Sequence, residues 1–559
     1  MKIFLPILAL SLFTIVHSQT LPLPEEYRLL SQYLKDRDVL LGEKILRDFP
    51  RAVFSEDLKL MIAEDLYKIG KPDDAKGYIQ KVDIKRLMSD MLSKYAELWK
   101  ELGLSKKEAL LSNPSLFRDF IGIVELKSEE ALYVAEKLIK ARYYEDALKL
   151  LVNFKKEDVC YYLGLTYYNT GNREHAKEVF EDCQDERVYP YLTRLYIEER
   201  NEDAVREVLV KVRSTELRDS LLFFMGRYYL YTGEYEKAKE YIFLMTDSYE
   251  RYFNLGLLNF IDADYEHASF YFMKALYLAK DKRDKSQASF WVYKSYFAEG
   301  KENIALRYLV EATKGDGFYS VLAKVYVGEP IVHRSLRHIL SDNILPSQAN
   351  VIKAIKDAGF YHYSRLEAFE RLERMSPSDI VAISRFDPFL AIKLAINKKG
   401  YSSQVYNLVA FPTPYDVYVY EASEHFDVPT EVIWAVMRQE SLFDPNAVSS
   451  SKAKGLMQLM DSTASWIAKK VGLRNFNIYD PKDNIKLGTA YLRHLYDYWG
   501  GDLVRVLASY NAGENRVNGW RNYRDTHVFI ETIPYEETRN FVKKVLYNFY
   551  VYRELLSLK

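Results

Sequence analysis

Apolar positions recur at helical spacing along most of this chain. From about residue 25 to residue 330 the pattern is helical almost throughout, with few strand-like alternations and few prolines. Such a pattern predicts amphipathic helices. Prolines then become frequent, and Phe411-Pro412-Thr413-Pro414 marks the sharpest break, since each proline ends any helix before it. We expect an all-α protein with a domain boundary near residue 411.

A set of small and large residues recurs at fixed offsets inside the helical region. The first clear copy is Gly164, Tyr167, Gly171, Ala176 and Phe180. Three later copies and two weaker, earlier ones have Gly226, Tyr229, Gly233, Ala238 and Ile242; Gly256, Ala268, Phe272 and Ala275; Tyr296, Gly300, Ala305 and Leu309; Gly70 and Ala75; Ala147 and Leu151. This recurrence indicates a structural repeat.

These offsets resemble the tetratricopeptide helical hairpin. A small residue on the first helix lets the second helix approach closely, and glycine ends the first helix at the turn. One hairpin cannot bury its apolar face alone, so the copies are expected to stack into a solenoid. The copies are irregularly spaced along the chain, which predicts a degenerate α-superhelix. A plain helical bundle is the alternative.

The first residues have the pattern of a secretory signal peptide. Lys2 is followed by an apolar run from Ile3 to Val16, and Val16 and Ser18 are the small residues at the positions typical of a cleavage site. An uncleaved anchor is the alternative. No later segment reaches about 18 apolar residues, so we expect no stable membrane insertion. The signal peptide predicts export to the periplasm as a soluble protein.

Composition and charge narrow the possible functions. The 78 Lys and Arg residues are balanced by 79 Asp and Glu, so the chain lacks the basic footprint of nucleic-acid binding. The 47 tyrosines suit helix packing or a carbohydrate groove. Cys160 and Cys183 could form a disulfide in an oxidising compartment or remain buried thiols, and both possibilities stay open.

Glu440 is the strongest candidate for chemistry. Ile433, Val436 and Met437 form the apolar stripe of a predicted helix, and the same spacing continues to Glu440. Burial disfavours the charged carboxylate, so we expect a raised pKa, which suits a general acid. The competing interpretation is an acid that pairs with Arg438 or caps a local backbone group.

Four motifs follow one another around and after Glu440. They are the Glu440-Ser441 pair, residues 455–460 (GLMQLM), residues 509–513 (SYNAG) and residues 529–539, which end in Glu537-Thr538-Arg539. In this order they resemble the catalytic domain of family 1 soluble lytic transglycosylases, over roughly residues 412 to 555. The resemblance implies a lysozyme-like α domain.

The resemblance also implies roles for individual residues. Glu440 takes the place of the catalytic acid/base, and Ser449 that of a serine that contacts substrate. Gln458 and Met460 match groove residues, Tyr510 the tyrosine beside the acid, and Glu537 a sugar-contacting glutamate. Ser509 and Asp461 stand where the family usually has Ala and Pro. No cofactor and no metal are implied.

The expected organisation is a signal peptide at residues 1–18, a tetratricopeptide-like helical superhelix at 19–330, a helical linker subdomain at 331–411, and the lysozyme-like domain at 412–559. The expected reaction is non-hydrolytic cleavage of the bond between N-acetylmuramic acid and N-acetylglucosamine in peptidoglycan glycan strands, which leaves 1,6-anhydromuramic acid ends. A muramidase-type hydrolase, or a non-catalytic repeat scaffold that binds glycan or partner proteins, is the alternative. Cell-wall synthesis proteins are a further partner class that the superhelix could bind.

Overall fold

The computed structural model describes residues 22–332, 346–399 and 409–557. The predicted signal peptide, residues 1–18, lies outside the described residues. Within these ranges the chain is helical, and isolated β-bridges join Val448 to Lys454 and Lys454 to Leu459. The all-α prediction is confirmed. None of the described helices is long and apolar enough to cross a membrane.

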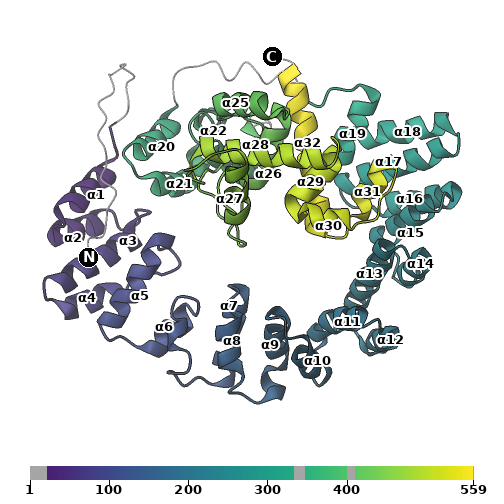
Figure 1. Cartoon of the computed structure of the whole chain (residues 1–559). Coiled ribbons are helices and arrows are strands. Elements are labelled where there is room, and N and C mark those ends of the chain that lie inside the picture. Colours follow the sequence, from purple (N-terminus) through teal and green to yellow (C-terminus); the bar gives the residue numbers. More distant parts are fainter. Residues whose placement is uncertain (1–21, 333–345, 400–408, 558–559) are drawn as a thin grey trace. The chain divides into compact units, whose positions relative to one another are not determined.

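The helices, many of which are labelled in Figure 1, divide into two compact units. The first unit combines residues 1–91 with residues 338–409. Within this unit the Tyr363 hydroxyl donates to Asp57 Oδ2 over 2.9 Å, which joins its two chain segments. Its helices are α1 (Glu25–Asp36), α2 (Val39–Asp48), α3 (Ser55–Lys68), α4 (Pro72–Ile79), α20 (Ser347–Asp357), α21 (Tyr361–Glu370), α22 (Pro377–Ile383) and α23 (Pro388–Lys399), with short 3-10 turns η1 (Ser89–Met91) and η5 (Leu372–Arg374).

The second unit combines residues 92–337 with residues 410–559. Its helices before the break are α5 (Leu92–Glu101), α6 (Lys106–Ser112), α7 (Ser128–Lys140), α8 (Tyr144–Leu151), α9 (Lys156–Asn169), α10 (Arg173–Glu181), α11 (Tyr189–Glu198), α12 (Glu202–Lys211), α13 (Thr215–Thr232), α14 (Tyr235–Phe243), α15 (Tyr249–Ile261), α16 (Tyr265–Leu278), α17 (Lys282–Ala298), α18 (Glu302–Thr313) and α19 (Gly317–Val327), with short turns η2 (Arg118–Phe120) and η3 (Glu186–Val188). After the break come α25 (Asp416–Phe426), α26 (Thr430–Ser441), α27 (Asp461–Lys470), α28 (Pro481–Tyr498), α29 (Leu503–Ala512), α30 (Glu514–Asn518), α31 (Thr526–Thr532) and α32 (Glu536–Ser557).

The repeats are antiparallel helix pairs, as the offsets predict. A Cβ atom placed on Gly226 of α13 would lie 2.3 Å from Ile242 Cδ1 of α14, far closer than atoms can approach. Gly164 in α9 meets Phe180 of α10 in the same way. Gly233 ends α13 with a φ of +85°, a conformation that glycine adopts without steric cost.

The repeat offsets in the sequence did not reveal one of the hairpins. Helices α11 and α12 form a further pair between α9/α10 and α13/α14. Thr193 stands where three of the other copies carry a contact glycine (Gly164, Gly226 and Gly256), so the repeat is present without its most visible residue. The irregular spacing of the recognised copies follows in part from this hidden pair.

Cys160 of α9 and Cys183, which follows α10, form a disulfide with a Cα–Cα distance of 5.7 Å. The bond ties the two helices of one hairpin together. Of the two possibilities that the sequence left open, the structure has the disulfide.

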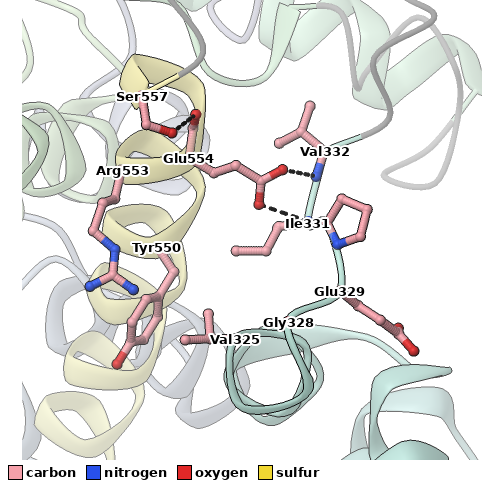
Figure 2. A pocket seen from close by; sticks show the side chains of 10 residues that line it. Val325, Gly328, Glu329, Ile331, Val332, Tyr550, Arg553, Glu554 and Ser557 are labelled. Carbon is pink, nitrogen blue, oxygen red and sulfur yellow. Dashed lines mark hydrogen bonds between the residues drawn. The ribbon is translucent and has the colours of Figure 1, made fainter.

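The last helix, α32, connects the two parts of the second unit. It packs against α26 and α29 on one side and against α19 of the repeats on the other. Near its end, the Glu554 carboxylate accepts hydrogen bonds from the backbone N–H groups of Ile331 (2.8 Å) and Val332 (3.1 Å), as Figure 2 shows. The helices after residue 410 are therefore anchored on the repeats of the same unit.

Candidate active site

Helix α26 positions Glu440 through its buried faces. Residues 432–438 are all buried, and α26 packs along α32. Arg438 is held by Ala410 O, to which its Nε donates over 2.6 Å, and by Asn548 Oδ1 at 3.0 Å. The guanidinium of Arg438 is thus engaged away from Glu440, and the competing interpretation of a local Glu440–Arg438 pair finds no support.

The Glu440 carboxyl is the most strongly perturbed acid of the site. Burial, aided by the negative charge of Glu537, raises its pKa to about 8. Among the described residues, none forms a hydrogen bond or ion pair that would stabilise its charged form. A carboxyl group with this pKa retains its proton at neutral pH and can deliver it to a substrate, because a general acid works best with a pKa near the working pH.

Ser441 fastens the end of α26 to the GLMQLM segment. Its hydroxyl donates to Leu456 O over 2.7 Å and accepts from the Phe443 N–H over 3.1 Å. Leu442 and Phe443 then adopt positive φ values of 49° and 70°, which turn the chain sharply away from the helix. The position of Glu440 is therefore linked to the loop that follows.

Asn484 of α28 holds the other side of the GLMQLM segment. Its Oδ1 accepts from the Met457 N–H over 2.8 Å, and its Nδ2 donates to Ile478 O (2.7 Å) and Lys454 O (3.2 Å). The side chain is fully buried. Because Gly488 carries no side chain, Met457 can pack directly on α28; a Cβ there would lie 2.2 Å from the Met457 sulfur.

Tyr510 of α29 lies between this segment and Glu440. Its hydroxyl donates to Met457 O over 2.8 Å. Burial and the neighbouring Glu440 charge raise the pKa of Tyr510 well above its usual value, so it remains a neutral phenol. Since its proton is directed to Met457, the oxygen of Tyr510 retains lone pairs that can accept a hydrogen bond.

The remaining predicted groove residues have different surroundings. Ser449 accepts from the Ala453 N–H over 3.0 Å and closes a tight turn. Gln458 has a φ of +49°, and its Nε2 donates to Gly455 O (2.8 Å) and Ala447 O (3.1 Å). The Met460 side chain is 42 % exposed just before α27. Gln458 therefore braces its own loop through its amide nitrogen, while its amide oxygen makes no hydrogen bond to a described residue.

Glu537 lies at the start of α32, where its side chain is exposed. It lines a cavity of about 770 Å³ together with Asn511, Ser451 and residues of the repeats. Arginines from both parts of the unit contribute to the walls: Arg194, Arg227, Arg516 and Arg539. The structure thus brings Glu537 into electrostatic reach of Glu440 and next to a cationic cavity.

A buried polar network that sequence reasoning missed supports the segment before Glu537. The Glu531 carboxylate accepts from Gln287 Nε2 (2.8 Å) of α17, from the Tyr319 hydroxyl of α19 and from Lys543 Nζ of α32. Burial opposes its ionisation, but Lys543, the Tyr319 hydroxyl and the charge of Arg539 together outweigh this effect and lower the pKa of Glu531. The one available signal was an acidic residue inside the otherwise apolar run of residues 528–533.

No group of three or more His, Cys, Asp or Glu side chains that could hold a metal ion occurs in the described ranges. The chemistry that the site offers is proton transfer. Glu440 has a proton to give at neutral pH, the Tyr510 hydroxyl and the Gln458 amide oxygen can accept hydrogen bonds, and Glu537 adds a negative charge within reach of Glu440.

Comparisons with known proteins agree with this geometry. Residues 417–532 match the family model of the transglycosylase SLT domain, and residues 157–186 and 249–282 match tetratricopeptide repeats. An uncharacterized protein of Aquifex aeolicus is 31% identical to this chain over 160 residues. The match covers 83% of the Aquifex protein and 29% of this chain. The chain belongs to the transglycosylase SLT domain family. The family resemblance read from residues 412–555 is confirmed.

Larger SLT proteins resemble the chain over a wider range. The soluble lytic murein transglycosylase of Escherichia coli K12 is 25% identical over 290 residues, covering 48% of this chain and 44% of the relative. The chain thus spans less than half the length of that curated relative in the match. The structure of the 70 kDa soluble lytic transglycosylase of Escherichia coli has a TM-score of 0.59 at 18% identity and covers 94% of this chain and 91% of its own.

The structure of an inactive mutant of the lytic transglycosylase Slt from Pseudomonas aeruginosa has the same TM-score of 0.59 at 20% sequence identity. The match covers 95% of this chain and 91% of the Pseudomonas chain. At these identities the likeness concerns the fold. The predicted architecture, a tetratricopeptide-like superhelix followed by a lysozyme-like helical domain, is confirmed.

Proposed function

We propose that this protein is a peptidoglycan lytic transglycosylase in which Glu440 acts first as acid and then as base. The observation that carries the proposal is the carboxyl of Glu440: it lies half-buried at the end of α26 beside Tyr510, and desolvation raises its pKa to about 8. The substrate class is supported by the SLT domain match over residues 417–532 and by the likeness to soluble lytic murein transglycosylases.

The first step cleaves the glycosidic bond. Glu440 gives its proton to the oxygen that links C1 of N-acetylmuramic acid to the next N-acetylglucosamine, and the C1–O bond breaks with its electron pair on that oxygen. The carbonyl oxygen of the 2-acetamido group bonds to C1 and takes up the developing positive charge. Glu440 is now a carboxylate, which its buried position destabilises and thereby makes a stronger base.

The second step closes the 1,6-anhydro ring. The Glu440 carboxylate removes the proton of the sugar's own 6-hydroxyl, O6 bonds to C1, and the acetamido oxygen leaves C1. The proton is back on Glu440, so the cycle balances without water. An intramolecular hydroxyl competes well because it is held at high effective concentration.

Five further residues are proposed to bind the glycan. Tyr510 offers a hydrogen-bond acceptor beside Glu440, Gln458 offers its amide oxygen, and Met460 offers an exposed apolar contact. Ser449 and Glu537 border the same region from the loop and from α32. Hydrolysis is the competing reaction, because Glu537 brings a second carboxylate near Glu440 and such a group could orient water.

Product analysis in ¹⁸O-labelled water tests the proposal. Purified sacculi are digested, and the released fragments are identified by mass spectrometry. The lytic reaction predicts unlabelled muramic ends that are lighter by one water. Labelled reducing ends would instead identify a muramidase, and no release of fragments would favour a repeat scaffold without catalysis.

The remaining predictions from the sequence form part of the proposal. We propose export by the segment at residues 1–18, action in the periplasm, and domain boundaries at residues 330 and 411. Protein partners from cell-wall synthesis would bind the repeats. Cell fractionation checks the location, since retention in the cytoplasm would contradict it.

A further inference from the structure

A second cavity lies in the same unit, away from Glu440. It measures about 530 Å³ and is walled by α15, α16, α17, α19 and residues 523–528, which lead into α31. Its lining shares no residue with the cavity that contains Glu537. Tyr523 of this cavity and Pro534 of the other both line a third, much smaller pocket of about 10 Å³. The second cavity is therefore separate from the candidate active site.

Aromatic rings form the walls of this cavity. The side chain of Phe297 is 53 % exposed and that of Tyr326 is 49 % exposed, although both belong to well-packed helices. Tyr293 lies between them, with ring centroids 5.8 Å from Phe297 and 6.5 Å from Tyr326. Exposed aromatic faces that gather in one concave place are typical of a binding site.

A charged cluster forms the polar part of the lining. Lys294 Nζ pairs with the Asp525 carboxylate and lies 3.3 Å from His527 Nδ1. The other ring nitrogen of His527, and the hydroxyls of Tyr293 and Tyr326, make no hydrogen bond to any described residue. Several donors and acceptors are thus left available beside flat apolar rings.

The aromatic walls and the charged cluster together favour one class of ligand over others. Lys294 and Arg524 disfavour a cation, which would otherwise suit an aromatic cage. A wholly apolar ligand would remove Asp525 and His527 from water without replacing their hydrogen bonds, which is costly. A pyranose ring has both features that the cavity can satisfy, since its C–H faces stack on aromatic rings and its hydroxyls bond to polar side chains.

We infer that the cavity is a second carbohydrate-binding site, which takes a pyranose ring of an oligosaccharide between Phe297, Tyr326 and the Lys294–Asp525–His527 cluster. The preference for N-acetylated sugars rests on the proposed function, whereas the preference for a pyranose rests on the cavity itself. Such a site would hold one part of a glycan while another part is cleaved at Glu440.

Photoaffinity labelling tests the site directly. The full chain carrying Glu440→Gln is irradiated with N-acetylglucosamine tetrasaccharide that bears a diazirine, and the labelled peptides are mapped by mass spectrometry. We expect labelling within residues 290–298 or 523–528 that excess unlabelled tetrasaccharide prevents. Removing one stacking ring, by Phe297→Ala or Tyr326→Ala, should reduce this labelling about two- to tenfold.

Matched variants separate binding from folding. Tyr326→Phe retains the ring and should retain most of the labelling. Tyr277→Ala removes an 89 % exposed tyrosine from α16 that does not line the cavity, so it should change nothing. Labelling confined to residues 440–460 or 510–540 would overturn the inference. So would equal labelling in the Phe297→Ala variant, or an equal loss in Tyr277→Ala. Because the readout is binding in a variant without turnover, it is independent of whether the product analysis supports the transglycosylase.

Discussion

The repeat hairpins and the surroundings of Glu440 are both helical, but their buried positions serve different purposes. In the hairpins, contacts such as Gly226 against Ile242 recur from copy to copy, and each one sets the distance between two helices. Around Glu440 the decisive contacts occur once: one asparagine, Asn484, holds the GLMQLM segment, and one carboxyl group is buried without a compensating partner.

Because the hairpin contacts set the fold and the contacts around Glu440 set its reactivity, substitutions in the two regions should have different effects. A change at a hairpin contact such as Gly226 against Ile242 should lower stability and leave proton transfer intact, because no described hairpin residue contributes to the pKa shift of Glu440. A change at the site should alter activity more than stability, and at Glu440 itself it should even raise stability. Proteins commonly sacrifice some stability to place a reactive group in an unfavourable environment.

The largest expected effect is that of Glu440→Gln. The amide cannot exchange a proton, so turnover should fall about 10²–10⁴-fold. Between pH 4.5 and 8 the unfolded chain loses this proton while the folded protein keeps it, so the wild type loses stability as pH rises. The variant should therefore unfold at a higher temperature than the wild type at pH 8, with a smaller difference at pH 5. A variant less stable than the wild type at pH 8 would contradict the buried acid.

The second-largest effect is expected for Gly226→Leu, and it concerns stability alone. Gly226→Leu would place a side chain where Ile242 Cδ1 already lies, and such overpacking costs roughly 1–3 kcal/mol or more. Gly77→Leu is the control, because a Cβ atom there meets nothing within 4 Å in an exposed turn of α4. Denaturant unfolding followed by circular dichroism measures both. Equal loss of stability in the two variants would show that the close approach of α13 and α14 is not what requires glycine.

An intermediate effect is expected at Asn484. Alanine leaves the buried Met457 N–H without an acceptor, which costs about 1–3 kcal/mol, and displaces the GLMQLM segment. We expect kcat to fall about tenfold with a smaller change in KM. Asn484→Asp retains the acceptor for Met457 but loses both donors, so it should lie between the wild type and the alanine variant. Full activity in Asn484→Ala would contradict the positioning role.

The smallest effect is expected for Tyr510→Phe. Losing the hydrogen bond to Met457 O costs about 0.5–1.5 kcal/mol, which corresponds to a decrease in kcat of roughly two- to tenfold. Tyr491→Phe removes a hydroxyl from the neighbouring ring, whose partner is Glu514 at 3.3 Å. This control should remain within about twofold of the wild type. Steady-state kinetics on a soluble glycan distinguish the two variants.

The repeat fold could be predicted from the sequence because one contact recurs with the same residues at the same offsets. The prediction missed α11 and α12, where Thr193 takes the position of the contact glycine. The disulfide between Cys160 and Cys183 could be suggested by spacing, but choosing it over buried thiols needed the positions of α9 and α10.

Glu440 could be predicted because it continues an apolar stripe and stands in a family motif. Its raised pKa depends partly on Glu537, which lies 97 residues later and approaches only in the fold. The network around Glu531 joins α17, α19 and α32, and no local pattern reveals such a contact. Long-range polar contacts of this kind appear once and leave no repeat in the sequence.

The pH dependence of kcat/KM tests the role of Glu440 most directly. The active form carries the proton, so activity on a soluble glycan should remain level below pH 8 and fall tenfold per unit above it. Glu537→Gln should move the midpoint to lower pH, because the charge of Glu537 helps to raise the pKa of Glu440. A midpoint near 4.5 with activity rising as Glu440 ionises, or a fall above pH 8 that persists unchanged in Glu440→Gln, would contradict a protonated Glu440 as the acid.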